Sequence, residues 1–138
     1  AMRAKNGRAR LDTDLEPGLT VEGEEGKIHQ VLVNLIDNAL DAVKDVADAR
    51  VAVTMRAQGD DVIVEVADNG AGISDAAADK IFEPFFTTKV VGEGTGLGLW
   101  ISYAIAREHG GSLSAHNGVP RGAVFQLRLP RHLGPRKG

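Results

Sequence analysis

The sequence predicts one domain of the mixed α/β class, with strands and long helices following one another along a chain of 138 residues. Two stretches, 27–47 and 97–109, place apolar residues at the spacing of an amphipathic helix. Other stretches alternate apolar and polar residues, as strands with one buried face do. These stretches are 10–15, 19–22, 50–57, 61–68, 112–116 and 123–129.

The composition fits a single globular domain and excludes several classes of protein. Hydrophobic residues make up 43% of the chain and charged residues 25%, which is enough to build one core. The net charge is −3 and like charges are not clustered, which argues against a nucleic-acid partner. The absence of cysteine excludes disulfides, a thiol nucleophile and a zinc finger. No apolar run approaches the roughly 20 residues that span a bilayer.

The two ends of the chain are polar, and we expect the domain itself to span residues 10–130. Residues 1–9 are small or polar and are expected to fray, and residues 131–138 form a loose basic tail. The alternating stretches 10–15 and 19–22 flank Glu16-Pro17-Gly18, which is a typical turn sequence. They are interpreted either as a short hairpin or as two edge strands.

The stretch 27–47 carries a polar stripe beside its apolar one. Asn34, Asn38, Asp41 and Asp45 follow one another at intervals of four, three and four residues, so they share one side of the helix. Any one of them fits a solvated surface. Asparagine is nevertheless a poor choice inside a helix, because its side chain competes for backbone hydrogen bonds. Two asparagines one turn apart favour a ligand role, and amide oxygens together with a phosphate suit Mg²⁺.

The stretches 50–57 and 61–68 are joined by Gln58-Gly59-Asp60, which is typical of a hairpin. Asp68 falls by parity on the apolar face of the second strand, and Asn69-Gly70-Ala71-Gly72 follows it. One interpretation is that the strand has ended and Asp68 caps a turn. The other is that its carboxylate points into a pocket and accepts a hydrogen bond from the exocyclic amine of a base. A buried carboxylate needs such a partner.

The region after this hairpin combines a short helix, an aromatic cluster and a cation. We expect a helix over 75–81 with Ser74 as its N-cap. Phe82-Glu83-Pro84-Phe85-Phe86 follows, and its aromatic residues also fit a small satellite core. Lys89 lies between this cluster and a glycine loop, where a cation can meet phosphate.

The stretch Glu93–His109 begins as a glycine loop and ends as a helix. Gly94, Gly96 and Gly98 lack a Cβ, so a ligand can approach the backbone. The helix N-terminus that follows attracts phosphate through free N–H groups and its dipole. By itself this pattern also fits a turn before a core helix. Gly110-Gly111 ends the helix, and the last two strands pair around Asn117-Gly118.

The order of these motifs resembles the ATP-binding catalytic domain of two-component sensor histidine kinases. Asn34 and Asn38 match the N box of that family, and Asp68–Gly72 matches its G1 box. Phe82–Phe86 matches the F box, and Gly94–Leu99 matches the G2 box. The resemblance covers nearly the whole chain, and four boxes in the right order are far more specific than one motif.

The resemblance implies a Bergerat fold, as found in the GHKL or HATPase proteins. This fold is a two-layer α/β (α+β) sandwich, in which three helices cover one face of a mixed, mostly antiparallel five-stranded sheet. The sequence pattern gives strands and helices in a compatible order, whereas the topology itself comes from the resemblance.

The resemblance also implies roles for the residues of the boxes. Asn38 is expected to ligate Mg²⁺, and Asn34 is expected to lie beside the triphosphate of ATP. Asp68 is expected to accept a hydrogen bond from the adenine amino group, while Gly70 and Gly72 let the base approach.

Residues between the F and G2 boxes are expected to form a mobile lid over ATP. Phe82–Thr88 would hinge this lid, which runs to about Gly94. Lys89 is expected to contact phosphates and to act with Asn38 in catalysis, and the amides of Gly94–Leu99 are expected to hold the terminal phosphates. The further residues expected to contact the nucleotide are Asp41, Ile73, Phe82, Thr87, Thr88, Thr95, Gly96, Leu97, Gly98 and Leu99.

The sequence departs from the family pattern at three positions. Val90 stands where a proline often follows the lysine, which loosens the lid. Trp100 stands where small polar residues are common. Asp41 stands where many relatives carry a basic or aromatic residue, which affects a phosphate contact.

Related ATPases are the main alternative. Hsp90-like chaperones, MutL-like repair proteins and type II topoisomerases look similar in the same boxes. They carry a glutamate one turn before the metal-binding asparagine, where it activates water, and this chain has Asn34 there. Asparagine cannot act as a general base. A regulatory module that binds nucleotide without turnover is a second alternative, and phosphotransfer to a cognate histidine domain would separate it from a kinase.

The implied activity is transfer of the γ-phosphoryl group of ATP to a histidine outside this chain. None of the four histidines, His29, His109, His116 and His132, lies in a His-Glu/Asp-x-x-x-Pro setting, and His109 is interpreted as a helix cap. The expected partners are the histidine-containing dimerisation domain of the same kinase and, downstream, a response regulator receiver domain. We expect this chain to be monomeric and cytoplasmic and the full-length kinase to be dimeric, with or without an anchor in the inner membrane.

Overall fold

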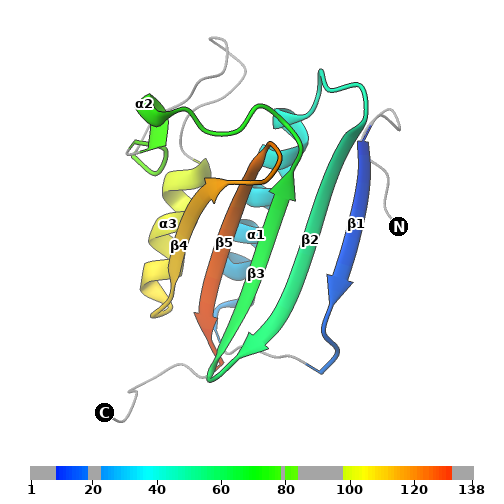
Figure 1. Cartoon of the computed structure of the whole chain (residues 1–138). Coiled ribbons are helices and arrows are strands. Elements are labelled where there is room, and N and C mark those ends of the chain that lie inside the picture. The colour runs from blue at the N-terminus through cyan, green and yellow to red at the C-terminus, as the bar shows by residue number, and fades with distance from the viewer. Residues whose placement is uncertain (1–8, 19–22, 79, 84–97, 132–138) are drawn as a thin grey trace.

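The computed structural model describes residues 9–18, 23–78, 80–83 and 98–131. Five strands form one sheet in the order β1-β2-β3-β5-β4 (Figure 1). Strands β1 and β2 are parallel, and the other neighbouring pairs are antiparallel. The strands are β1 Ala9–Leu15, β2 Ala49–Gln58, β3 Asp61–Asp68, β4 Ser112–Asn117 and β5 Ala123–Pro130. The mixed, mostly antiparallel five-stranded sheet is therefore confirmed.

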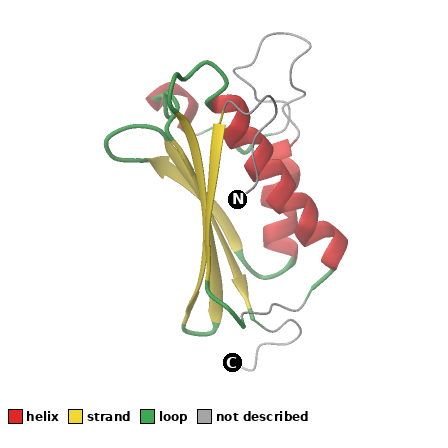
Figure 2. Cartoon of the chain, turned by 90° about the vertical axis from the view of Figure 1, so that its right-hand side faces the viewer, coloured by secondary structure: helices red, strands yellow, loops and turns green. Residues whose placement is uncertain are grey.

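The described residues form three helices, α1 Glu25–Ala42, α2 Asp75–Ala78 and α3 Gly98–Glu108. Helix α1 is the crossover between the parallel strands β1 and β2, and it lies with α3 against one face of the sheet (Figure 2). The core lies between these two layers. Its fully buried members include Val31 and Leu35 of α1, Val66 of β3 and Leu127 of β5. In the described part of the chain, no helix combines the length and the apolar character needed to cross a membrane.

Helix α1 ends earlier than the apolar stripe predicts, at Ala42 instead of residue 47. Val43 leaves the helical conformation with φ −109°, although its side chain is fully buried. The chain therefore turns while its apolar residues continue into the core. Asp45 is exposed and lies outside the helix, so the prediction that it extends the polar stripe is wrong.

The short second helix also ends earlier than the sequence predicts, and an apolar residue that follows it lies in the core. Helix α2 stops at Ala78 instead of residue 81, and Ser74 Oγ accepts the N–H of Ala77 at 3.1 Å, which confirms the predicted N-cap. Ile81 is buried. The Phe82 ring stacks on Tyr103 with a centroid distance of 5.5 Å.

The N-terminal strand is an edge strand of the described sheet. The strand begins at Ala9, one residue before the start of the predicted strand. Residues 19–22, predicted as the second short strand, lie outside the described residues. At the other end, the N–H of Arg131 still donates to the carbonyl of Asp60 at 2.9 Å.

Candidate functional site

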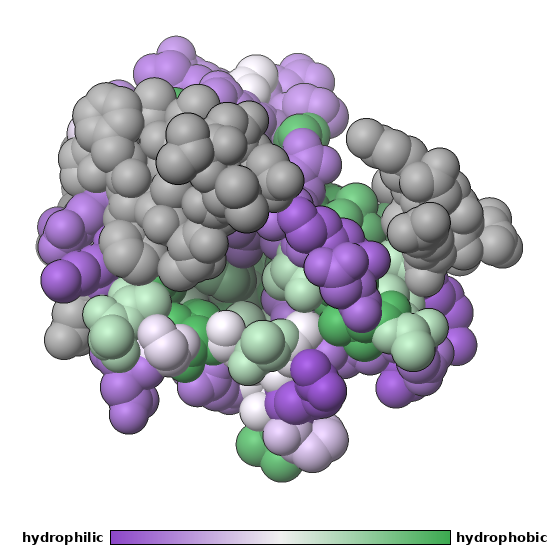
Figure 3. All heavy atoms as spheres, turned by 90° about the horizontal axis from the view of Figure 1, so that it is seen from above, coloured by the Kyte–Doolittle hydropathy of each residue, from purple (hydrophilic) through white to green (hydrophobic). Residues whose placement is uncertain are grey.

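The predicted site residues that the structure describes lie on elements that meet at one end of the sandwich, uppermost in Figure 1. Strand β3 ends there, helix α1 runs towards it, and helix α3 begins there. The turn between β4 and β5 lies at the same end. Seen from above, this end shows hydrophobic atoms between hydrophilic ones (Figure 3). Residues 68–73 run across it between β3 and α2.

Asp68 is the last residue of β3, and its side chain is only 7% exposed. Its Oδ1 accepts the N–H of Gly70 at 2.8 Å and the N–H of Ala123 at 3.3 Å. Burial raises the pKa of this carboxyl, while the two N–H donors oppose the shift. Asp68 therefore caps the turn, as one interpretation predicted, and it is also buried. A hydrogen bond from its carboxylate to the amine of a base stays a prediction.

The glycines after Asp68 are required by the packing of the protein itself. A Cβ on Gly70 would lie 2.6 Å from the carbonyl oxygen of Ala42, at the end of α1. Gly72 has φ +88°, and a Cβ there would lie 2.8 Å from Oδ1 of Asn117. This loop packs closely against two other elements, and that contact is sufficient to require glycine at both positions. Their expected role in admitting a base stays a prediction.

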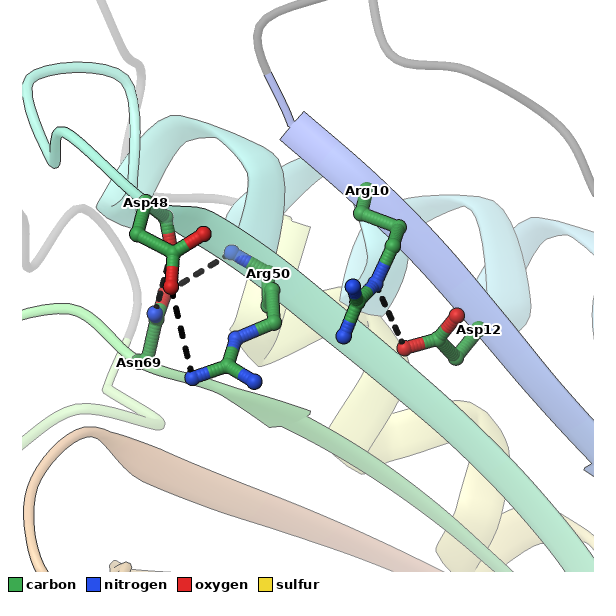
Figure 4. A network of polar contacts seen from close by, with 5 residues as sticks. All are labelled: Arg10, Asp12, Asp48, Arg50 and Asn69. Carbon is green, nitrogen blue, oxygen red and sulfur yellow. Dashed lines mark hydrogen bonds and ion pairs between the residues drawn. The ribbon is translucent and has the colours of Figure 1, made fainter.

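Asn69, to which the sequence assigned no role, joins the site to the start of β2 (Figure 4). Its Oδ1 accepts the N–H of Arg50 at 2.8 Å, and its Nδ2 donates to the carbonyl of Asp48 at 2.6 Å. The N–H of Asn69 also donates to the carbonyl of Arg50 at 3.3 Å. The antiparallel pairing thus continues one residue beyond Asp68. Figure 4 also shows two ion pairs, one between Arg50 and Asp48 at 3.6 Å and one on β1 between Arg10 and Asp12 at 3.1 Å.

The polar stripe of α1 faces the beginning of α3. Nδ2 of Asn34 lies 3.3 Å from the carbonyl oxygen of Gly98 and 3.2 Å from Oγ of Ser102, a fully buried residue. Asn34 therefore holds α1 against the first turn of α3. Its predicted position beside a triphosphate is not tested by these contacts. Asp41 pairs with Lys44 at 3.8 Å near the end of the helix.

Asn38 is half-buried one turn beyond Asn34, and its amide has no hydrogen-bond partner among the residues described. Within the same residues, no three histidine or carboxylate side chains converge on a point that could hold a metal. A single amide oxygen is a suitable but incomplete ligand set for Mg²⁺, which keeps several waters and takes further oxygens from phosphates. The residues present therefore fit a metal that arrives with a phosphorylated ligand.

The start of α3 supplies the second polar feature of the site. Gly98 is its first residue, Leu99 packs against the core, and Trp100 is 40% exposed. The first N–H groups of a helix have no partner within it and carry the positive end of the dipole.

Seven predicted site residues lie outside the described residues. These are Thr87, Thr88, Lys89, Gly94, Thr95, Gly96 and Leu97.

Two further residues that were predicted to contact the nucleotide, Phe82 and Ile73, pack within the fold. Phe82 is half-buried, and besides its stacking on Tyr103 it meets Phe125 edge-on at 6.2 Å. It packs against the main core, while Phe85 and Phe86, the other members of the predicted satellite core, lie outside the described residues. Ile73 packs against the core, and both of its backbone polar groups are bonded to the side chain of Asn117.

His109 is confirmed as a structural residue at the end of α3. Its ring is buried, and Nδ1 lies 2.9 Å from the carbonyl oxygen of Ile105. Nε2 accepts the N–H of Glu24 at 3.2 Å, so the neutral Nδ1–H form satisfies both contacts. His109 thereby ties the start of α1 to the end of α3.

Comparison with known proteins agrees with this arrangement. Residues 23–133 match the family model described as histidine kinase-, DNA gyrase B-, and HSP90-like ATPase. The two-component sensor PprA of Pseudomonas aeruginosa is 44% identical over 117 residues, which cover 81% of this chain and 13% of PprA.

Two solved structures are similar to the fold over nearly its whole length. The catalytic domain of the histidine kinase ThkA has a TM-score of 0.81 and 33% identity, covering 93% of this chain and 84% of that one. Full-length ShkA in complex with AMPPNP has a TM-score of 0.78 and 30% identity, covering 97% of this chain and 28% of that one. The chain thus spans a small part of the curated relative and nearly all of a kinase catalytic domain. It belongs to the histidine kinase, DNA gyrase B and HSP90-like ATPase family, with the fold of a histidine kinase catalytic domain.

Proposed function

We propose that this chain binds Mg·ATP and delivers the γ-phosphoryl group to a histidine on a dimerisation domain outside it. The observation that carries the proposal is the Asp68 carboxylate. It is buried at the end of β3, and both of its hydrogen bonds within the described residues go to Oδ1. Oδ2 is therefore left to accept a hydrogen bond from a ligand. The exocyclic amine of adenine is such a donor.

The polar end of α1 and the start of α3 support binding of the triphosphate. Asn38 has an amide oxygen to offer a metal, and Asn34 connects its helix to the first turn of α3. The N-terminus of α3 attracts phosphate. When bound, Mg²⁺ would neutralise charge on the phosphate oxygens. Lys89 is the second residue we propose to act on the phosphates, as the sequence resemblance implies.

The acceptor histidine must come from another domain. Of the histidines described, His109 is buried between two helices, and His29 and His116 are exposed without an acceptor motif. The matching relatives support this arrangement, since PprA is named a two-component sensor and ShkA was solved with an ATP analogue. We propose that the phosphoryl group then passes to a response regulator receiver domain. Because ATP is the donor, we propose that the reaction takes place in the cytoplasm.

A nucleotide titration with and without Mg²⁺ tests the binding half of this proposal. We expect ATP to bind more tightly with Mg²⁺, because Asn38 contributes only when a metal bridges it to phosphate. AMP should bind with little dependence on Mg²⁺. Absence of ATP binding under both conditions would contradict the proposal.

An ATPase remains the second candidate, because the family model is shared with DNA gyrase B and HSP90. Hydrolysis needs a group that activates water. The residue one turn before Asn38 is Asn34, whose Nδ2 already contacts Gly98 and Ser102. An amide in this position has no basic group to offer. Slow phosphate release by the chain alone is therefore the expected result, and rapid release would favour the ATPase.

A further inference from the structure

We propose that the turn between β4 and β5 clamps the base-binding loop, with Asn117 and Arg121 as positioning residues for nucleotide recognition. This inference rests on the proposed function, in which Asp68 accepts a hydrogen bond from the adenine base. The sequence assigned to Asn117-Gly118 only a turn. The turn leads into β5, which pairs directly with β3, and the loop that it holds, residues 68–73, follows β3.

Asn117 binds the loop through both ends of its amide. Its Oδ1 accepts the N–H of Ile73 at 2.6 Å, and its Nδ2 donates to the carbonyl of Ile73 at 3.0 Å. This pairing resembles one rung of an antiparallel ladder, made by a side chain instead of a strand. Two bonds to one residue fix both the position and the orientation of its backbone.

The other end of the turn holds the beginning of the loop. Nε of Arg121 donates to the carbonyl of Gly70 at 2.9 Å, and the N–H of Ala123 donates to Oδ1 of Asp68 at 3.3 Å. Gly122 has φ +92°, and a Cβ there would overlap the carbonyl oxygen of Asp68. The turn therefore touches the loop at three points along its length, and one of them is the carboxylate itself.

The consequence concerns the free oxygen of Asp68. Its Oδ1 is fixed by the N–H of Gly70 and of Ala123, so the direction of Oδ2 depends on where those two N–H groups lie. Arg121 holds Gly70 from its carbonyl side, and Asn117 holds the end of the same loop. Loss of either contact lets the loop move, and the hydrogen bond between Oδ2 and the amine of the base is then weakened. Contacts to phosphate, made on α1 and α3, do not depend on this turn.

The test compares ATP with inosine triphosphate, which carries a carbonyl in place of the adenine amine. Wild-type protein should prefer ATP by about tenfold or more, because a hydrogen bond to a charged group is lost with inosine. Asn117→Ala and Arg121→Ala should each lower this preference by about threefold or more, mainly by weakening the binding of ATP. Asn117→Asp should behave like Asn117→Ala, since it places an acceptor against the carbonyl of Ile73. His116→Ala, an exposed change next to Asn117, is the matched control and should keep the wild-type preference.

Melting without nucleotide and hydrogen exchange at the Ile73 amide accompany each titration. Faster exchange in Asn117→Ala is expected, because the acceptor of that N–H is gone. Should Asn117→Ala fail to fold, the ratio of ATP to inosine triphosphate affinity in Arg121→Ala tests the clamp instead. Arg121 is exposed, and its replacement removes one hydrogen bond, to the carbonyl of Gly70. An unchanged ratio, whether neither nucleotide loses affinity or both lose it equally, would overturn the clamp without contradicting the proposed function. Failure of the wild-type protein to bind ATP would instead overturn the proposed function, and the clamp with it.

Discussion

Asp68 is a buried residue whose two hydrogen bonds within the described residues both go to Oδ1, and the first prediction follows from replacing only Oδ2. In Asp68→Asn, the amide oxygen can still accept the N–H groups of Gly70 and Ala123, while Nδ2 takes the place of Oδ2. A donor then faces the adenine amine. We expect ATP binding to weaken by about 1.5–3 kcal/mol, the contribution of a hydrogen bond to a charged group. Calorimetric titration with ATP measures this loss. Affinity within about twofold of wild type would contradict the assignment.

The pKa of Asp68 gives a second prediction, on stability without nucleotide. Because burial raises the pKa in the folded state, the folded protein holds this proton more tightly than the unfolded chain does. Stability therefore falls as pH rises from the ordinary aspartate value of about 3.9 to the raised folded value, and stays lower above it. Asp68→Asn removes this penalty. Its melting temperature should match wild type below about pH 4 and exceed it at neutral pH. A variant less stable than wild type at neutral pH would contradict the sign of the shift.

Asn38 supports a third prediction, on the metal. Asn38→Ala should weaken Mg·ATP while leaving AMP binding unchanged, because AMP lacks the phosphates that bring the ion to α1. The residue is half-buried and has no hydrogen-bond partner in the described part of the chain, so the fold should tolerate the change. Titrations of both nucleotides with Mg²⁺ present measure the difference. Equal losses for AMP and Mg·ATP would assign Asn38 a structural role.

At the scale of elements, the side chain of Asn34 joins α1 to α3, and the fourth prediction concerns this contact. Asn34→Ala removes the donor to the Gly98 carbonyl and to the buried Oγ of Ser102. We expect it to lower the free energy of unfolding by about 1 kcal/mol, the typical net contribution of such hydrogen bonds. Val33→Ala, at a 40% exposed position in the same helix, is the control and should cost less. Urea denaturation compares them, and equal costs would show that Asn34 does not hold the helices together.

The sequence predicted the strands better than the ends of the helices. Alternation of apolar residues places Asp68 correctly on the inner face, because parity is a local property of a strand. The end of α1 at Ala42 is decided instead by where Val43 must sit in the core. The same holds for Ile81 and Phe82 after α2, whose apolar spacing alone predicts a longer helix.

Contacts between distant segments were beyond sequence pattern alone. Asn69 pairs with Arg50, and Asn117 with Ile73, across many intervening residues. Each asparagine stands in a sequence that also fits an ordinary turn, so nothing local identifies its partner. The parallel pairing of β1 with β2 is likewise set by the crossover through α1. The topology came from the resemblance of four motifs to a known family, and the family match and the fold have confirmed it.

For the whole molecule, the site is assembled at one end of the sandwich from a strand end, two helices and a turn (Figure 1). We propose that this arrangement provides groups for a base, a metal and phosphates, whereas no histidine in the described residues has an acceptor motif. Phosphoryl transfer depends mainly on positioning and charge neutralisation, so a domain of this kind can act on a nucleophile supplied by another.

The most direct test of the account is therefore transfer of label from γ-labelled ATP. Three incubations are compared: this chain alone, the dimerisation domain of its own kinase alone, and the two polypeptides mixed. We predict acid-labile label on the dimerisation domain in the mixture only, at a low rate because no tether raises the effective concentration. Asp68→Asn in the mixture should transfer less. Label on this chain alone, or rapid phosphate release without transfer, would contradict the assignment as a histidine kinase catalytic domain.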